Sequence, residues 1–170
     1  MAAATRSDQS KDLSPFFFSM RDIWPQDPPD AAPFHYQQNV QEWKALVGNK
    51  ANEQDIDTIL YHTEPDAFEN DFAQLTKTNS FVRALKQPQN RTLLQYMHLA
   101  KKIEAYAGNP DPWQENKYPD PNLDRLIKEA MALYNASTNT DIRLRAAYQL
   151  MRLYGYNGNG KLLTKTWEEK

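Results

Sequence analysis

The stretch AAYQLMRLYGYNGNGKLLTKTWEEK, residues 146–170, decides the fold of this chain. Its first part places apolar side chains at the 3.6-residue spacing of a helix that is buried on one face. A turn rich in glycine and asparagine follows, and a second amphipathic segment then begins with Leu162, Leu163 and Trp167. Two amphipathic helices joined by a short polar turn pack as an antiparallel hairpin. The stretch therefore predicts a helix–turn–helix unit.

The same helical spacing recurs through most of the remaining sequence, in segments bounded by glycine or by capping residues. Four short helices are expected: from residue 37 to Gly48, after the cap Asn52, after Thr63, and at 80–87. Three longer helices are expected at 90–107, from Pro121 through Tyr134, and from Thr138 onward. Within 90–107, a charged, solvent-facing side is expected at Lys101, Lys102 and Glu104. Few strand-like alternations appear, so the sequence predicts an all-α fold of antiparallel helical hairpins.

Residues 1–36 form a distinct leader that is rich in proline and in small polar residues. Roughly the first 12 residues are expected to be disordered, as chain termini often are. The part from 15 to 36 also carries large apolar side chains such as Trp24, which are uncommon in a free, solvent-exposed linker. We expect that part to lie as an irregular strap over a single α-helical domain at 37–170.

Composition excludes several classes of protein. The 170 residues carry 20 Lys and Arg against 22 Asp and Glu, a formal net charge of −2, whereas nucleic-acid binders usually show a basic excess. No apolar run approaches the ~20 residues of a membrane span. The chain has no cysteine, which excludes disulfides and thiolate metal sites but leaves the compartment open. An exported parent with a removed leader remains compatible with the sequence.

The end of the chain resembles a known repeat family. Leu150, Tyr154, Gly158 and Trp167 stand at the spacings of the tetratricopeptide repeat, a helix–turn–helix of 34 residues. The resemblance covers about residues 139–170, and Gly160 stands where the motif has an aromatic residue. More loosely, the chain resembles the N-terminal region of large bacterial proteins with repeat-like helices, a group with no known activity. The resemblance implies a right-handed, solenoid-like stack of hairpins.

Solenoids usually need several stacked repeats, because one repeat cannot bury its apolar face alone. The final segment KLLTKTWEEK is just over two helical turns long and carries apolar residues that need a surface. We therefore expect the chain to be truncated from a longer array, whose further repeats would be its partner. The alternative is that this segment is a natural capping helix.

The resemblance also points to a binding surface. Arg145, Tyr148 and Arg152 recur at i, i+3 and i+7, so they share one helical face. The corresponding positions of tetratricopeptide repeats line the groove that holds an extended peptide, and arginines grip carboxylates in a bidentate fork. These residues are therefore candidate contacts for a protein or peptide partner. The alternative is that the arginines pair with local acids such as Glu129 and Asp141.

Aromatic side chains in loops suggest a second function. Trp24, Trp113 and Tyr118 lie in segments rich in proline and, if exposed, would provide flat faces for stacking on sugar rings. The alternative to a protein-interaction module is accordingly a carbohydrate- or ligand-binding module.

Nothing in the sequence argues for catalysis or for a cofactor. His35, His62 and His98 lie on different helical turns and fit no zinc motif. The GYNGNG turn follows a helix and lacks the lysine of a phosphate-binding loop. The sequence therefore predicts a non-catalytic protein without metal or cofactor, and an enzyme whose site is assembled from distant residues is the least favoured alternative.

Overall fold

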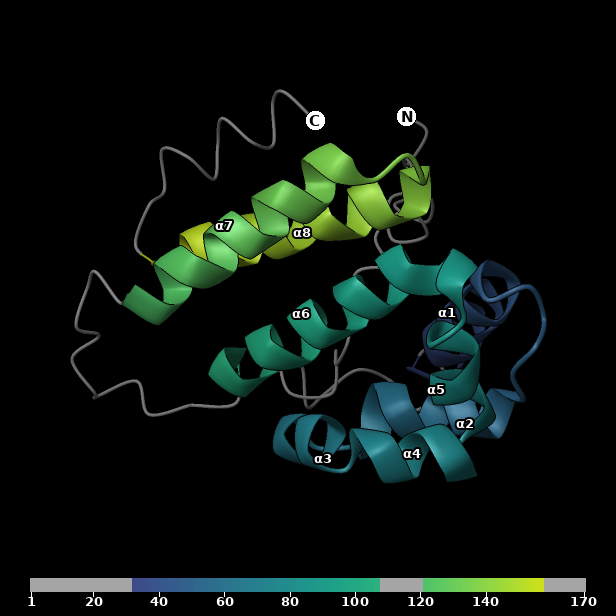
Figure 1. Cartoon of the computed structure of the whole chain (residues 1–170). Coiled ribbons are helices and arrows are strands. Elements are labelled where there is room, and N and C mark those ends of the chain that lie inside the picture. The colour runs from purple at the N-terminus through teal and green to yellow at the C-terminus, as the bar shows by residue number, and fades with distance from the viewer. Residues whose placement is uncertain (1–31, 108–120, 158–170) are drawn as a thin grey trace, which may run out of the picture. The chain divides into compact units, whose positions relative to one another are not determined.

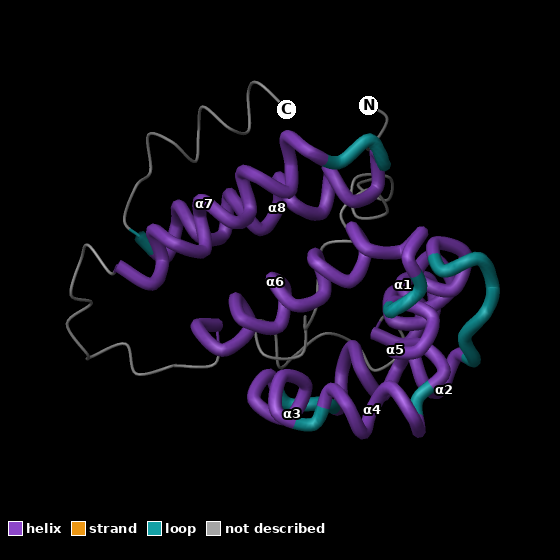
Figure 2. The backbone as a smooth tube through the Cα atoms, in the orientation of Figure 1, coloured by secondary structure: helices purple, strands orange, loops and turns teal. Residues whose placement is uncertain are grey.

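The computed structural model describes residues 32–107 and 121–157, in which every regular element is a helix (Figure 2). The α-helices of this part are α1 (Ala32–Leu46), α2 (Glu53–Asp57), α3 (Pro65–Asn70), α4 (Phe72–Thr78), α5 (Ser80–Leu85), α6 (Arg91–Ala107), α7 (Pro121–Ala136) and α8 (Thr140–Tyr156). A π-helical turn at Thr58–His62 continues α2, and a 3₁₀ turn at Pro88–Asn90 precedes α6. The all-α prediction is confirmed for these residues. The leader up to residue 31, the segment 108–120 and the final segment 158–170 lie outside the described residues.

The chain divides into two compact units. In the described residues, unit 1 comprises 32–63 and 74–84, and unit 2 comprises 64–73 and 85–157. The single truncated domain expected at 37–170 stays a prediction. Each unit has its own buried apolar core and is described separately below.

Helix α1 of unit 1 begins at Ala32, so the last five residues assigned to the strap are helical. Pro33 explains the difference, because proline has no backbone N–H to lose in the first turn of a helix. The helix ends as predicted near Gly48, where φ is +70°. The Gly48 N–H donates to Ala45 O at 2.9 Å and the Asn49 N–H to Lys44 O at 2.8 Å. These two bonds form a Schellman motif, which favours glycine at this position.

The acceptor groups of Asp55 join the starts of α2 and α5 in unit 1. Asn52 caps α2 as predicted, and its side chain accepts a hydrogen bond from the Asp55 N–H at 2.7 Å. The Asp55 carboxylate accepts from both the backbone N–H and the hydroxyl of Ser80, the first residue of α5. Asn79 then donates to Asp55 O at 3.0 Å and accepts from the N–H groups of Phe81 and Val82. One set of short polar side chains thus satisfies the free N–H groups of two helices.

The core of unit 1 lies next to this polar junction. Trp43 of α1 is fully buried and meets Phe81 of α5 edge to face, with ring centroids 5.6 Å apart. Ile56, Ile59 and Leu60 are also buried, as their spacing predicted.

Two predicted helix starts are wrong by one residue. Thr63 was expected to cap α3, but the N-cap is Glu64, and the Thr63 hydroxyl donates back to Thr58 O at 2.9 Å. Thr138 was expected to cap α8, but the N-cap is Asn139, whose side chain accepts from the Ile142 N–H at 3.1 Å. Before α8, Thr138 and Asn139 are both good capping residues, so composition alone does not select between them, whereas the Glu64 side chain makes no capping hydrogen bond.

In unit 2, α7 and α8 form the predicted antiparallel hairpin (Figure 1). Asn157 at the end of α8 donates to Asp124 near the start of α7 at 3.1 Å. Arg143 near the start of α8 donates to the Tyr134 hydroxyl near the end of α7 at 3.3 Å. These bonds fix the opposite directions of the two helices. Helix α6 contacts both of them and also contacts α3.

Truncation of Leu150 should reveal how much this hairpin depends on its buried face. Leu150 has no exposed surface, so Leu150→Ala is expected to lower the free energy of unfolding by about 2–5 kcal/mol. Leu144 lies on the same helix but is 48% exposed, and Leu144→Ala should change it by no more than about 0.5 kcal/mol. Urea unfolding followed by circular dichroism measures both. Equal effects would mean that the wrong face of α8 is buried.

Removal of the Asp55 carboxylate should weaken unit 1. Asp55→Ala leaves the backbone N–H and the hydroxyl of Ser80 without their acceptor, and a lost acceptor of this kind costs about 1–2 kcal/mol. Asp57→Ala is the matched control, because Asp57 only forms an ion pair with the exposed His62, at 3.1 Å. If both variants unfold at the same urea concentration, the hydrogen bonds to the Asp55 carboxylate do not add to the free energy of unfolding.

The contribution of Asp55 should also depend on pH. Partial burial acts to raise the pKa of Asp55, but hydrogen bonds from Ser80 and Asn52 outweigh it and hold the pKa below its usual value. A lowered folded-state pKa means that the stabilisation is complete above about pH 4, the unfolded value, and is lost as the pH falls through the folded value. The difference between wild type and Asp55→Ala should therefore shrink in acid. A difference that is constant down to pH 2 would contradict this account.

Candidate functional site

The three α8 residues predicted to contact a partner lie in unit 2, and the structure separates them by burial. Arg145 is only 2% exposed, whereas Tyr148 and Arg152 are half-buried. The three residues share one side of α8, as the helical spacing predicts, but that side is buried at Arg145 and only partly exposed at Tyr148 and Arg152. In this structure Arg145 lines no open surface, and the accessible part of the predicted site is Tyr148 and Arg152.

The inward side of α8 forms a polar seam with α6. Tyr96 of α6 is 1% exposed and accepts a hydrogen bond from the fully buried Gln149 of α8 at 3.3 Å. Burial raises the pKa of Tyr96, against the opposing positive charges of Arg145 and Arg152. The phenol therefore stays neutral and serves as a hydrogen-bonding group between the helices.

Arg152 is held in place by its neighbours on α8. Its guanidinium donates from Nη1 to Gln149 Oε1 at 3.3 Å and from Nη2 to the Tyr156 hydroxyl at 3.0 Å. The same group lies 5.9 Å from the ring centroid of Tyr148 and 5.7 Å from that of Tyr156, within the range of cation–π attraction. We call this set of four residues the Arg152 clamp. It fixes the guanidinium, while the two bonds use only two of its five N–H groups.

The expectation that Lys101 faces solvent is wrong, whereas the Glu104 side chain is 36% exposed and is only partly turned inward. Lys101 has no exposed surface, and its Nζ lies 3.0 Å from Glu104 Oε2. Burial raises the pKa of Glu104, although the positive charge of Lys101 opposes the rise and Arg152 does so to a smaller extent. The physical reason is that α6 contacts α3, α7 and α8, which leaves it little solvent-facing side. Lys102, one residue further, is half-buried.

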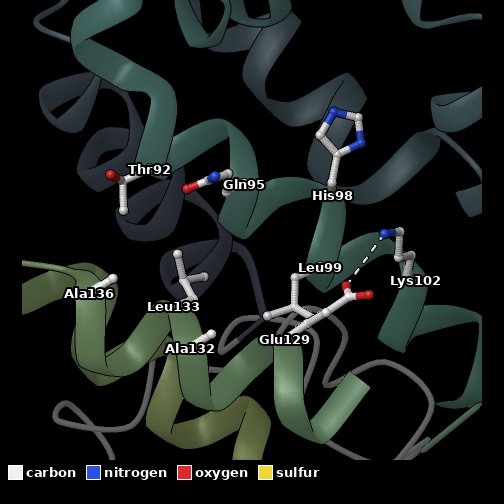
Figure 3. A pocket seen from close by; sticks show the side chains of 9 residues that line it. All are labelled: Thr92, Gln95, His98, Leu99, Lys102, Glu129, Ala132, Leu133 and Ala136. Carbon is white, nitrogen blue, oxygen red and sulfur yellow. Dashed lines mark hydrogen bonds and ion pairs between the residues drawn. The ribbon is translucent and has the colours of Figure 1, made fainter. Parts of the chain in front are cut away.

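A second surface of unit 2 is an open groove between α6 and α7 (Figure 3). Its α6 wall carries mostly polar side chains, and its α7 wall carries two alanines, a leucine and a glutamate. The lining residues are Thr92, Gln95, His98, Leu99, Lys102, Glu129, Ala132, Leu133 and Ala136. Lys102 spans one end of the groove to Glu129, with Nζ and Oε2 3.5 Å apart. We call it the α6–α7 groove.

His98, which lines this groove, is fixed by residues from the start of unit 2. Its Nδ1 lies 2.8 Å from Glu69 Oε1, and the rings of Phe68 and Phe72 lie 5.2 and 5.0 Å from its ring. These contacts hold α3 and the first residues of α4 against α6. His98 thus has a packing role, and the described residues hold no group of three or more His, Cys, Asp or Glu that would bind a metal ion.

The residues of the carbohydrate alternative, Trp24, Trp113 and Tyr118, lie outside the described residues, and that alternative stays a prediction. None of the described helices is both long and apolar enough to cross a membrane.

Sequence reasoning missed the burial of Lys101 and Gln149 and the hydrogen bond between Gln149 and Tyr96. Gln149 lies three residues after Ala146 and four before Leu153. Helical spacing therefore places it on the same buried face of α8 as these two residues. Lys101 and Glu104 are an i, i+3 pair of opposite charge, which is equally common on exposed faces. No sequence signal distinguishes the two cases.

Comparison with known proteins gave no relative: no protein-family model, curated protein or solved structure matches this chain. The resemblance to tetratricopeptide repeats at 139–170 therefore stays a prediction, and the second helix of that motif falls outside the described residues.

Removal of the Lys101 ammonium should destabilise unit 2. Lys101→Ala leaves the Glu104 carboxylate without its partner, and the expected loss is about 1–3 kcal/mol, because Lys101 is buried but the Glu104 side chain is 36% exposed and solvent screens part of the pair. Lys102→Ala removes the same side chain from a 40% exposed position, where ion pairs contribute about 0–1 kcal/mol. Urea unfolding of wild type and of the two variants measures the loss of unfolding free energy caused by each substitution. Similar losses would mean that burial of Lys101 has no energetic consequence.

The loss in Lys101→Ala should shrink as the pH falls. Without Lys101 the already raised pKa of Glu104 rises further, so the folded variant binds a proton at higher pH than the folded wild type. The variant therefore regains stability relative to wild type on acidification. A gap that widens towards pH 4 would contradict the assigned pairing.

Proposed function

We propose that this chain is a non-catalytic protein-interaction module of helical-repeat type, which binds an acidic group of a protein or peptide partner at the Arg152 clamp. The observation that carries the proposal is the fixed position of the Arg152 guanidinium between Tyr148 and Tyr156. Both tyrosines and Arg152 are half-buried, so the site combines partial exposure with restricted motion. Arg145, which the sequence grouped with them, is excluded as a direct contact because it is 2% exposed.

Restricted motion matters because binding usually costs side-chain entropy. A long arginine side chain that is already held by hydrogen bonds loses little freedom when it engages a ligand. Its remaining N–H groups suit a carboxylate, which accepts two parallel hydrogen bonds from one guanidinium. Tyrosine and arginine are also the residue types that carry most binding energy in protein interfaces.

The test uses a fluorescein-labelled hexaglutamate peptide and the full chain. Arg152→Gln should weaken binding about tenfold or more, because hydrogen bonds to charged groups contribute about 1.5–3 kcal/mol. Arg143→Gln is the matched control: Arg143 also lies over a tyrosine, Tyr134, at 5.0 Å, but among the described residues no second ring lies against its guanidinium. Fluorescence anisotropy gives both affinities.

Binding should also weaken as salt rises, since the clamp is partly exposed to solvent. If hexaglutamate does not bind the wild-type chain, or binds Arg152→Gln and Arg143→Gln equally, the proposed function is wrong. Circular dichroism verifies that both variants fold.

A further inference from the structure

We propose that the α6–α7 groove is a second docking surface, which binds one amphipathic helix of a partner protein through an apolar face and an acidic residue. This goes beyond the acidic contact at the Arg152 clamp, because the groove lies between a different pair of helices and shares no residue with that clamp. The apolar face would lie over Leu99, Ala132 and Leu133, and the acidic residue would pair with Lys102 and Arg125.

The walls of the groove fit a helix. Both walls are themselves helices, and a third helix packs in such a groove when its axis can approach to about 8–10 Å. Ala132 and Ala136 on the α7 wall are exposed and short, so they allow that approach. Leu99 and Leu133 lie buried below them and provide an apolar floor (Figure 3). Docking of an amphipathic helix into an apolar groove is a recurrent mode of protein recognition.

The charges at one end of the groove specify the partner further. Glu129 is shared by two cations: its Oε2 lies 3.5 Å from Lys102 Nζ and its Oε1 lies 4.0 Å from Arg125 Nε. The side chains of Lys102 and Arg125 are 40% and 65% exposed, so both remain accessible. These three side chains together carry one net positive charge, and the Glu69 carboxylate lies one turn away on the other side of His98. A carboxylate on the partner complements this positive charge.

The other end of the groove is uncharged, with Thr92 and Gln95 facing Ala136 (Figure 3). Glu129 and Ala136 are seven residues apart, or about 10 Å along α7 at 1.5 Å per residue. The partner helix should therefore carry Asp or Glu about two turns away from the apolar side chain that contacts Ala136.

The experiment pans a phage-displayed library of random 16-residue peptides against the full chain. The peptides that enrich should share apolar residues at i, i+3 or i+4 and an acidic residue about seven positions away. Ala132→Trp fills the groove and should reduce the affinity of these peptides at least tenfold. Ala73→Trp adds the same bulk at an exposed position of unit 2 outside the groove and should leave the affinity unchanged.

Charge reversal provides a second measurement that does not depend on added bulk. Lys102→Glu should weaken the selected peptides at least fivefold, and a peptide with Lys in place of its acidic residue should regain the affinity for this variant. Lys128→Glu makes the same change on α7 at an exposed position outside the groove, and should have no such effect.

Failure of this proposal is distinguishable from failure of the proposed function. Arg152→Gln should bind the selected peptides as wild type does; a loss there would place them at the Arg152 clamp and overturn the groove proposal. The proposal is also overturned if no peptide enriches, if Ala132→Trp binds normally, or if the Lys-substituted peptide does not recover binding to Lys102→Glu.

Discussion

Unit 2 depends on the position of α6, which contacts α3, α7 and α8. A helix in contact with three others can present only a narrow side to solvent, yet α6 has the polar residues of an ordinary surface helix. Its sequence therefore forces polar groups inside. Tyr96 and Lys101 are both buried, and each has a specific partner, Gln149 for the hydroxyl and Glu104 for the ammonium. An unpartnered group at either position would cost several kcal/mol, so the partners on α6 and α8 are a condition for this packing.

The seam also accounts for the character of the Arg152 clamp. Gln149 uses its amide N–H for Tyr96 and its amide oxygen for Arg152, so one buried side chain connects the inside of the unit to its surface. Arg152 is therefore anchored at a point that cannot move without disturbing the contact between α6 and α8. An exposed arginine would normally sample many rotamers, and this anchor removes much of that freedom. The rigid packing below it is thus the source of the pre-organisation that the proposed binding needs.

The sequence predicted helices where apolar periodicity was strong and failed where burial of polar groups decided the structure. The positions of α6, α7 and α8 followed from residues such as Leu93, Leu126 and Leu150, and the end of α1 followed from Gly48. The burial of Arg145 and Lys101 did not follow, because long charged side chains read as exposed unless the number of neighbouring helices is known. That number depends on tertiary contacts, which a single sequence does not display. The α6–α7 groove could not be predicted from the sequence for the same reason, because it depends on how two helices pack.

The two surfaces of α6 are linked by the helical period. Lys101 and Lys102 are adjacent in sequence and so point about 100° apart around the axis. Once Lys101 is buried against Glu104, Lys102 must lie on the side that meets Glu129 of α7. Rotation of α6 by one residue would bring Lys102 to the buried position of Lys101, so it would remove the positive end of the α6–α7 groove. The rotation of α6 that buries Lys101 therefore also determines which charges the groove presents.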